Sequence, residues 1–62
     1  MIKVIITLKG NEANPYAEVM RREEAINLHH SIFVKPHPYV TVRVGNGEVT
    51  FRPADVLSLT LG

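Results

Sequence analysis

The stretch PYVTVRVGNGEVTFRP, residues 38–53, places the strongest constraint on the fold. Valines alternate with polar residues before the glycines, and Val49 and Phe51 alternate with polar residues after them. Alternation with a period of two is typical of half-buried strands, and Gly-Asn-Gly accepts the positive φ angles that a tight hairpin turn needs. We therefore predict a β-hairpin with strands at 39–44 and 48–52 and with its apolar side chains facing the core.

Two further strands are predicted near the ends of the sequence. Residues 2–9 place a row of apolar side chains on one face: Ile2, Val4, Ile6 and Leu8. Residues 56–61, which follow a turn at 52–55, place Leu57, Leu59 and Leu61 on one face. The alternation in both segments favours strands.

A helix is predicted within residues 14–32. The segment YAEVMRREEAINLHH, residues 16–30, contains neither Gly nor Pro and is rich in helix formers. Asn14 is a suitable N-cap, and Pro15 suits the first helical position. The helix must end before the residue that precedes Pro36, because that residue is biased away from helical dihedral angles.

Residues 26–34 leave an alternative open. Their apolar side chains also fit a period of two, interrupted at one position: Ile26, Leu28, Ile32 and Val34. A helix that ended near Ala25 and gave way to an extended segment would produce a five-stranded fold. We prefer a helix to about residue 31, because the segment contains no early turn signal.

These elements predict an α+β fold for a single domain, residues 1–62. Its order is β-α-β-β-β, with one helix packed on a small, mostly antiparallel four-stranded sheet. A chain this short gains only about 3–5 kcal/mol from its core, and the sequence has no cysteine for a disulfide. We predict a homodimer that covers Ile32 and Phe33, which we expect to be exposed; the alternative is a monomer that folds them under the helix end.

The three histidines, His29, His30 and His37, lie within nine residues. Adjacent residues on a helix point about 100° apart, so His29 and His30 cannot easily share a metal ion. His37 lies beyond the helix, between two prolines. This pattern indicates a helix end followed by a turn, and we expect neither a metal nor a cofactor.

We also expect no catalytic residues. The hydroxyl side chains lie mainly in predicted strands, where Thr is favoured, and none is accompanied by an evident base. Asp55 stands at a strand entry, where a carboxylate commonly caps a turn. The sequence therefore indicates a protein that is not an enzyme.

One face of the predicted sheet is basic. The candidate binding residues on it are Lys3, Lys9, Tyr39, Arg43 and Arg52. Cations can meet phosphates and a tyrosine can stack on a base, so this face predicts a nucleic-acid interface as one class of function. Seven Lys and Arg against six Asp and Glu weaken that interpretation, because the net charge is only +1.

The first ten residues, MIKVIITLKG, are apolar but interrupted by two lysines. They are too short for a membrane span and lack a small-residue cleavage site, so we expect a cytoplasmic protein without a membrane partner.

The segment GNGEVTFRPADVLSL, within residues 45–61, resembles the endings of small uncharacterised phage and prophage proteins. Many of these close with a strand, a short turn with Pro and Asp, and a final strand similar to DVLSL. The resemblance implies an accessory or regulatory gene product. We therefore expect a non-enzymatic binding protein of phage or mobile-element type that contacts an unidentified macromolecule, with nucleic-acid binding as the alternative.

Overall fold

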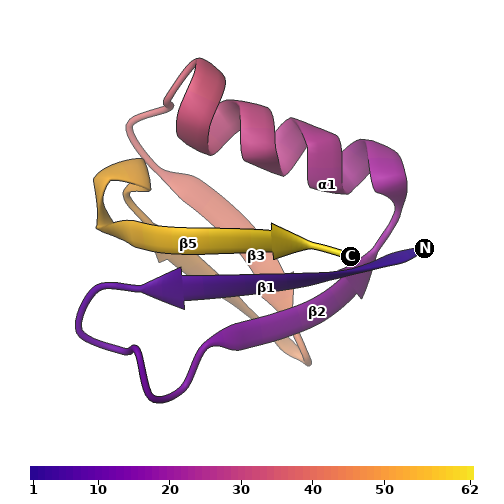
Figure 1. Ribbon diagram of the computed structural model, residues 1–62, viewed down its shortest axis with the longest axis horizontal. Coiled ribbons are helices and arrows are strands. Elements are labelled where there is room, and N and C mark those ends of the chain that lie inside the picture. The colour runs from indigo at the N-terminus through magenta and orange to yellow at the C-terminus, as the bar shows by residue number, and fades with distance from the viewer.

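The structure is a computed structural model that describes residues 1–62. Its elements follow one another in this order: β1 (Ile2–Leu8), β2 (Tyr16–Met20), α1 (Arg22–His29), the π-helical turn η1 (His30–Val34), β3 (Val40–Val44), β4 (Gly47–Phe51), the 3₁₀ turn η2 (Pro53–Asp55) and β5 (Val56–Leu61). The strands form two antiparallel sheets, β2-β1-β5 and β3-β4, and α1 lies along one side of both (Figure 1). The predicted α+β class, with one helix, is confirmed.

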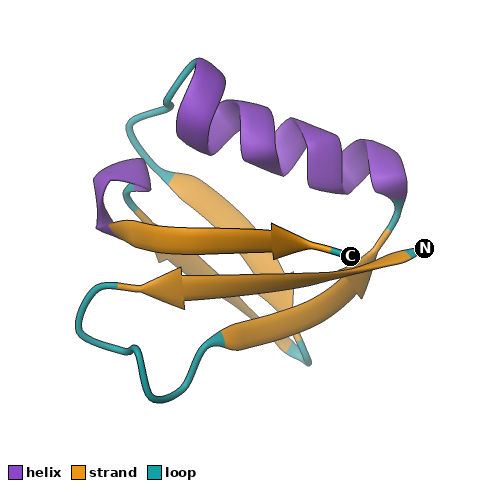
Figure 2. Cartoon of the chain, viewed as in Figure 1, coloured by secondary structure: helices purple, strands orange, loops and turns teal.

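The main difference from the prediction is β2, which we had placed in the helix. Tyr16–Met20 pairs with β1 from Ile6↔Tyr16 to Ile2↔Met20, so its backbone hydrogen bonds go to a neighbouring strand. This pairing also buries the side chain of Met20. Asn14 lies between β1 and β2 and does not cap a helix. Figure 2 shows the connection between these two strands as a loop. Tertiary pairing overrides helix propensity here, because propensity differences between such residues are well below 1 kcal/mol.

The helical region is therefore shorter at its start and longer at its end than predicted. It begins at Arg22 and continues through the π-turn to Val34, which settles the alternative for residues 26–34 in favour of helix. Its buried side chains are Ala25, Leu28 and Ile32, which are spaced three and four residues apart as on one helical face. Ile32 is only 3% exposed, so the expectation that it is exposed was wrong, whereas Phe33 is 50% exposed.

The β3–β4 hairpin is confirmed. Its register runs from Val40↔Phe51 to Val44↔Gly47, and the hydroxyls of Thr41 and Thr50 lie 2.9 Å apart across the strands. Gly45 has a φ of 59° and is the only residue of the turn with a positive φ, which is the pattern of a type II′ hairpin turn.

A β-bulge changes the expected face of Leu57. The pairs Thr7↔Ser58 and Leu8↔Val56 leave Leu57 without a partner on β1. Leu57 is therefore 56% exposed, and Val56 packs against the core in its place. We predicted that one face of this strand carries Leu57, Leu59 and Leu61, and this prediction is wrong for Leu57. The extra residue of the bulge shifts the in–out alternation of the side chains, so Leu57 no longer shares a face with Leu59 and Leu61.

Two sheets replace the single four-stranded sheet that we predicted. Both edges of β1 are occupied, by β2 and by β5, so the β3–β4 hairpin has no edge of β1 to join. It packs its apolar face over the same core instead. That core contains Val4, Ile6, Met20, Ala25, Leu28, Ile32, Val40, Val42 and Phe51.

Candidate functional site

The five residues of the predicted basic face are exposed, but the structure divides them between the two sheets. Lys3 lies on β1 and Lys9 directly after it, whereas Tyr39, Arg43 and Arg52 lie on or beside β3 and β4. The apolar faces of the two sheets meet in one core, so their outer faces point in different directions. Arg52 is also paired with the carboxylate of Asp55 at 3.3 Å. The residues therefore lie on two outer faces, which come together where the backbone N–H of Lys9 donates to the backbone carbonyl of Asp55 at 2.7 Å, beside Arg52.

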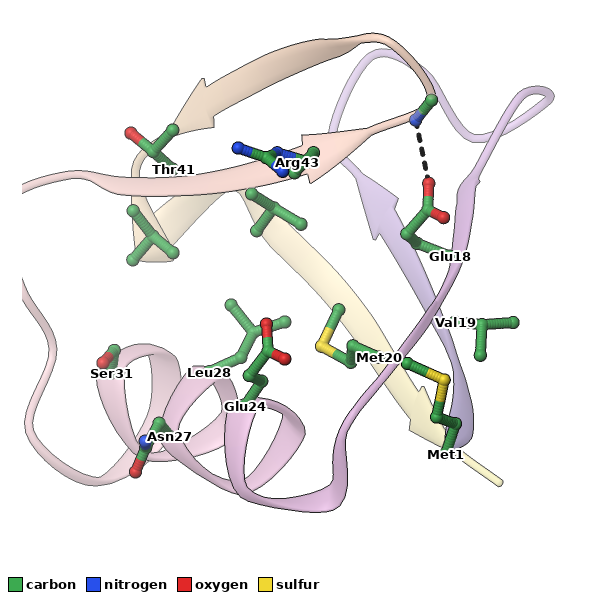
Figure 3. A pocket seen from close by; sticks show the side chains of 13 residues that line it. Met1, Glu18, Val19, Met20, Glu24, Asn27, Leu28, Ser31, Thr41 and Arg43 are labelled. Carbon is green, nitrogen blue, oxygen red and sulfur yellow. Dashed lines mark hydrogen bonds between the residues drawn. The ribbon is translucent and has the colours of Figure 1, made fainter.

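A groove that the sequence did not indicate lies between β2, α1 and β3, and its volume is about 440 Å³ (Figure 3). Its apolar wall contains Met20, Leu28, Val40 and Val42. Polar side chains also line it: Glu18, Glu24, Asn27, Ser31, Thr41 and Arg43. The volume lies within the range of about 300–1,000 Å³ that is usual for ligand sites. The groove could not be predicted because β2, one of its walls, was assigned to a helix.

One side of this groove is an unpaired strand edge. The pair Val44↔Gly47 closes a two-residue turn and is therefore a hydrogen-bonded pair, and such pairs alternate with non-hydrogen-bonded pairs along an antiparallel ladder. Val40, Val42 and Val44 consequently bond to β4, while the backbone groups of Thr41 and Arg43 point away from β4. No backbone–backbone hydrogen bond outside the regular elements uses the N–H or C=O of Thr41 or Arg43.

A single hydrogen bond closes one end of the groove. The backbone N–H of Gly45 donates to Oε2 of Glu18 at 2.9 Å, and Figure 3 shows this bond between the tip of the β3–β4 hairpin and β2. It joins residues 27 positions apart. The bond therefore ties the tip of the hairpin to the other sheet and leaves the space between β3 and α1 open.

The carboxylates of the groove have no cationic partner within the protein. The only ion pair is Arg52–Asp55, which lies outside the groove, so neither Glu18 nor Glu24 is paired with Lys or Arg. Arg43 is the one charged cationic side chain among the lining residues. The cationic groups that line the groove are the Arg43 guanidinium and the α-amino group of Met1, and neither lies within 4.0 Å of the carboxylate of Glu18 or Glu24.

The methionines add a further property to this site. Met1 and Met20 both line the groove, and Figure 3 shows their side chains near the end of β2. Methionine is unbranched and polarisable, so it adapts its shape to different apolar partners. This part of the groove can therefore adjust to an apolar side chain of a ligand.

The histidines lie elsewhere. His29, His30 and His37 are exposed, and the ring of His29 lies 5.2 Å from that of Phe33 at an angle of 47°. No group of three or more His, Cys, Asp or Glu side chains is arranged to hold a metal ion. None of the helices has the length and apolar character needed to cross a membrane.

Comparisons with protein-family models, with curated proteins and with solved structures found no match to this chain.

Proposed function

We propose that this chain is a non-enzymatic, cytoplasmic binding protein that holds an extended segment of another protein as an added strand on β3. The observation that carries this proposal is the unpaired edge of β3, which forms one side of a groove with an apolar wall and a helix on its other side. Adding a strand to an exposed sheet edge is a recurring way to recognise peptides.

The groove meets the two requirements of this binding mode. Thr41 and Arg43 each offer one N–H and one C=O, so an added strand could form about four backbone hydrogen bonds, each contributing about 0.5–1.5 kcal/mol net. Side chains alternate along the added strand, so every second one would face Leu28, Val40 and Val42. The backbone bonds would supply affinity, and the apolar wall would select side chains.

Nucleic-acid binding is the less favoured class. It needs a continuous cationic surface to neutralise several phosphates, and the predicted basic residues lie on two separate sheets. The accessory or regulatory role of phage or mobile-element type stays a prediction, supported by the resemblance of residues 45–61.

The test uses a displayed library of random linear peptides, selected for binding to the immobilised protein. Thr41→Pro removes the N–H that points into the groove, and proline is tolerated where that N–H faces away from the ladder. Thr50→Pro is the matched control, because Thr50 is the cross-strand partner of Thr41 and its N–H points to the opposite edge of the same sheet. We expect Thr41→Pro to weaken the binding of the selected peptides by about two- to tenfold and Thr50→Pro to leave it nearly unchanged.

Amide hydrogen exchange of the unmodified protein provides a second measurement that does not depend on a proline variant. In the complex, the amides of Thr41 and Arg43 should become protected. Failure to select any peptide, or binding without protection of these amides, would overturn the proposal. Protection that rises with protein concentration in the absence of peptide would assign this edge to a second copy of the chain instead.

A further inference from the structure

We infer that the groove selects a basic partner: an extended segment in which apolar side chains are accompanied by a Lys or Arg that meets Glu24. This inference rests on the proposed strand addition to β3 and names the chemistry of the strand that is added. It follows from the positions of Glu24 and Glu18 on the walls of the groove, where neither carboxylate has a Lys, Arg or N-terminal nitrogen within 4.0 Å.

Glu24 is the central residue. It lies on α1, across the groove from β3, and Figure 3 shows its side chain beside Leu28 on the side of the helix that borders the groove. It is exposed and has no Lys or Arg nitrogen within 4.0 Å, since the ion pair Arg52–Asp55 is the only one that meets this limit. A strand placed between β3 and α1 would pass directly between this carboxylate and the unpaired backbone edge.

Glu18 extends the acidic side of the groove to its closed end. Its Oε2 accepts the hydrogen bond from Gly45, so Oε1 remains free to accept a bond from a ligand. Glu18 and Glu24 lie on different elements, β2 and α1, and both line the same groove. An added strand that ran toward the closed end would therefore meet a carboxylate there as well.

The shape of Lys and Arg suits these surroundings. Their long aliphatic stems can lie along apolar surface while the charged head reaches a polar group at the rim. Here the stem would lie against Leu28 and Met20, and the head would reach Glu24. Either a short cation or an acidic side chain would lose one of these two contacts.

Arg43 sets a second preference on the opposite side of the strand. Its side chain is exposed, on the outer face of β3, while Val42 and Val40 face the core. Residues directly opposite one another on neighbouring strands interact, and like charges there are destabilising. The residue of the added strand opposite Arg43 should therefore be acidic or neutral, so the cation is expected only on the side that faces α1.

The test measures selectivity for charge at one position of a bound peptide. A peptide selected from the displayed library is synthesised in two forms, with Lys or with Glu at the position whose effect on affinity depends on Glu24. The affinity of each form is then measured for the unmodified protein and for each variant. The variant Glu24→Lys reverses the charge in the groove. Glu23→Lys makes the same change at the neighbouring helix residue, which is exposed and does not line the groove.

We expect the selected peptides to be enriched in Lys and Arg. The unmodified protein should prefer the Lys form by about tenfold, Glu24→Lys should prefer the Glu form, and Glu23→Lys should keep the original preference. The preference should also shrink as salt is raised, because exposed charge pairs are screened.

Two outcomes would overturn the inference, and they differ in what else they overturn. If peptides bind along β3 but show no enrichment in cations, and Glu24→Lys leaves the preference unchanged, the charge selection is wrong and strand addition stands. If no peptide binds at all, the proposed function fails, and the selection fails with it.

Discussion

Ile5 and Ile6 are neighbours on β1, and their side chains lie on opposite faces of the strand. Substitutions at these two residues therefore test which face of β1 packs against the core. Ile6 is 2% exposed and belongs to the core. Ile5 lies on the outer face, half-buried between Ala17 of β2 and Thr60 of β5. Thr is β-branched like Ile, so replacing either residue with Thr keeps much of the strand propensity, and the two variants differ mainly in burial.

The structure predicts a large difference between these variants. Ile6→Thr removes two carbon atoms from the core, about 1.6 kcal/mol at about 0.8 kcal/mol per carbon. It also buries a hydroxyl without an evident partner, which costs about 1–3 kcal/mol more. The total of about 2.6–4.6 kcal/mol is close to the whole stability of about 3–5 kcal/mol that a core of this size supplies. Ile5→Thr should cost less than about 1 kcal/mol, because its hydroxyl reaches solvent.

Urea unfolding followed by far-ultraviolet circular dichroism measures both free energies. We expect Ile6→Thr to be substantially unfolded without urea, and Ile5→Thr to unfold cooperatively near the midpoint of the unmodified protein. Equal destabilisation by the two substitutions, or a midpoint for Ile6→Thr close to that of the unmodified protein, would refute the assignment of the two faces of β1.

Two further predictions concern the hairpin turn and self-association. Gly45→Ala should lower the free energy of unfolding by about 1–2 kcal/mol, because Gly45 has a φ of 59°, which is unfavourable for a residue with a Cβ. The added Cβ would meet nothing within 4 Å, so this cost comes from the backbone conformation and not from a steric clash. Gly47→Ala is its control, since Gly47 has no positive φ and equally open surroundings; a thermal unfolding midpoint lowered as much in this variant would contradict the role of the turn. The homodimer stays a prediction, and sedimentation equilibrium should show a species larger than 6.9 kDa. Phe33→Ser, which removes an apolar side chain that is 50% exposed, should abolish this species. Val34→Ser is the control, because Val34 is 55% exposed, and this variant should retain the species. A monomer at millimolar concentration would exclude it.

Much of the fold could be predicted because its causes are local. The β3–β4 hairpin follows from alternating valines around a Gly-Asn-Gly turn, and the core face of β1 follows from Val4 and Ile6 at a spacing of two. The helical pattern of residues 22–34 also had a local cause, since the chain has no turn signal there until Pro36. Each of these elements needs only its own residues to be recognised.

The candidate site could not be predicted, because it is made by elements that meet only in three dimensions. Lys3 and Arg43 were expected on one face and lie on different sheets, since that expectation assumed one four-stranded sheet. Glu18 and Glu24 were expected on one helix, whereas Glu18 lies on a strand and bonds to Gly45 across the groove. The sequence shows no periodicity that would bring these residues together.

By itself, the sequence determined the α+β class, the hairpin, and a single helical segment, because alternation, turn chemistry and the absence of breakers act over a few residues. Only the tertiary structure decided that Tyr16–Met20 is a strand, that Leu57 bulges outward, and that β3 keeps a free edge beside α1. Local preferences in these segments differ by a few tenths of a kcal/mol per residue, whereas pairing with β1 satisfies a whole row of backbone groups and buries Met20. The larger, non-local terms therefore decided these features, and with them the shape of the groove.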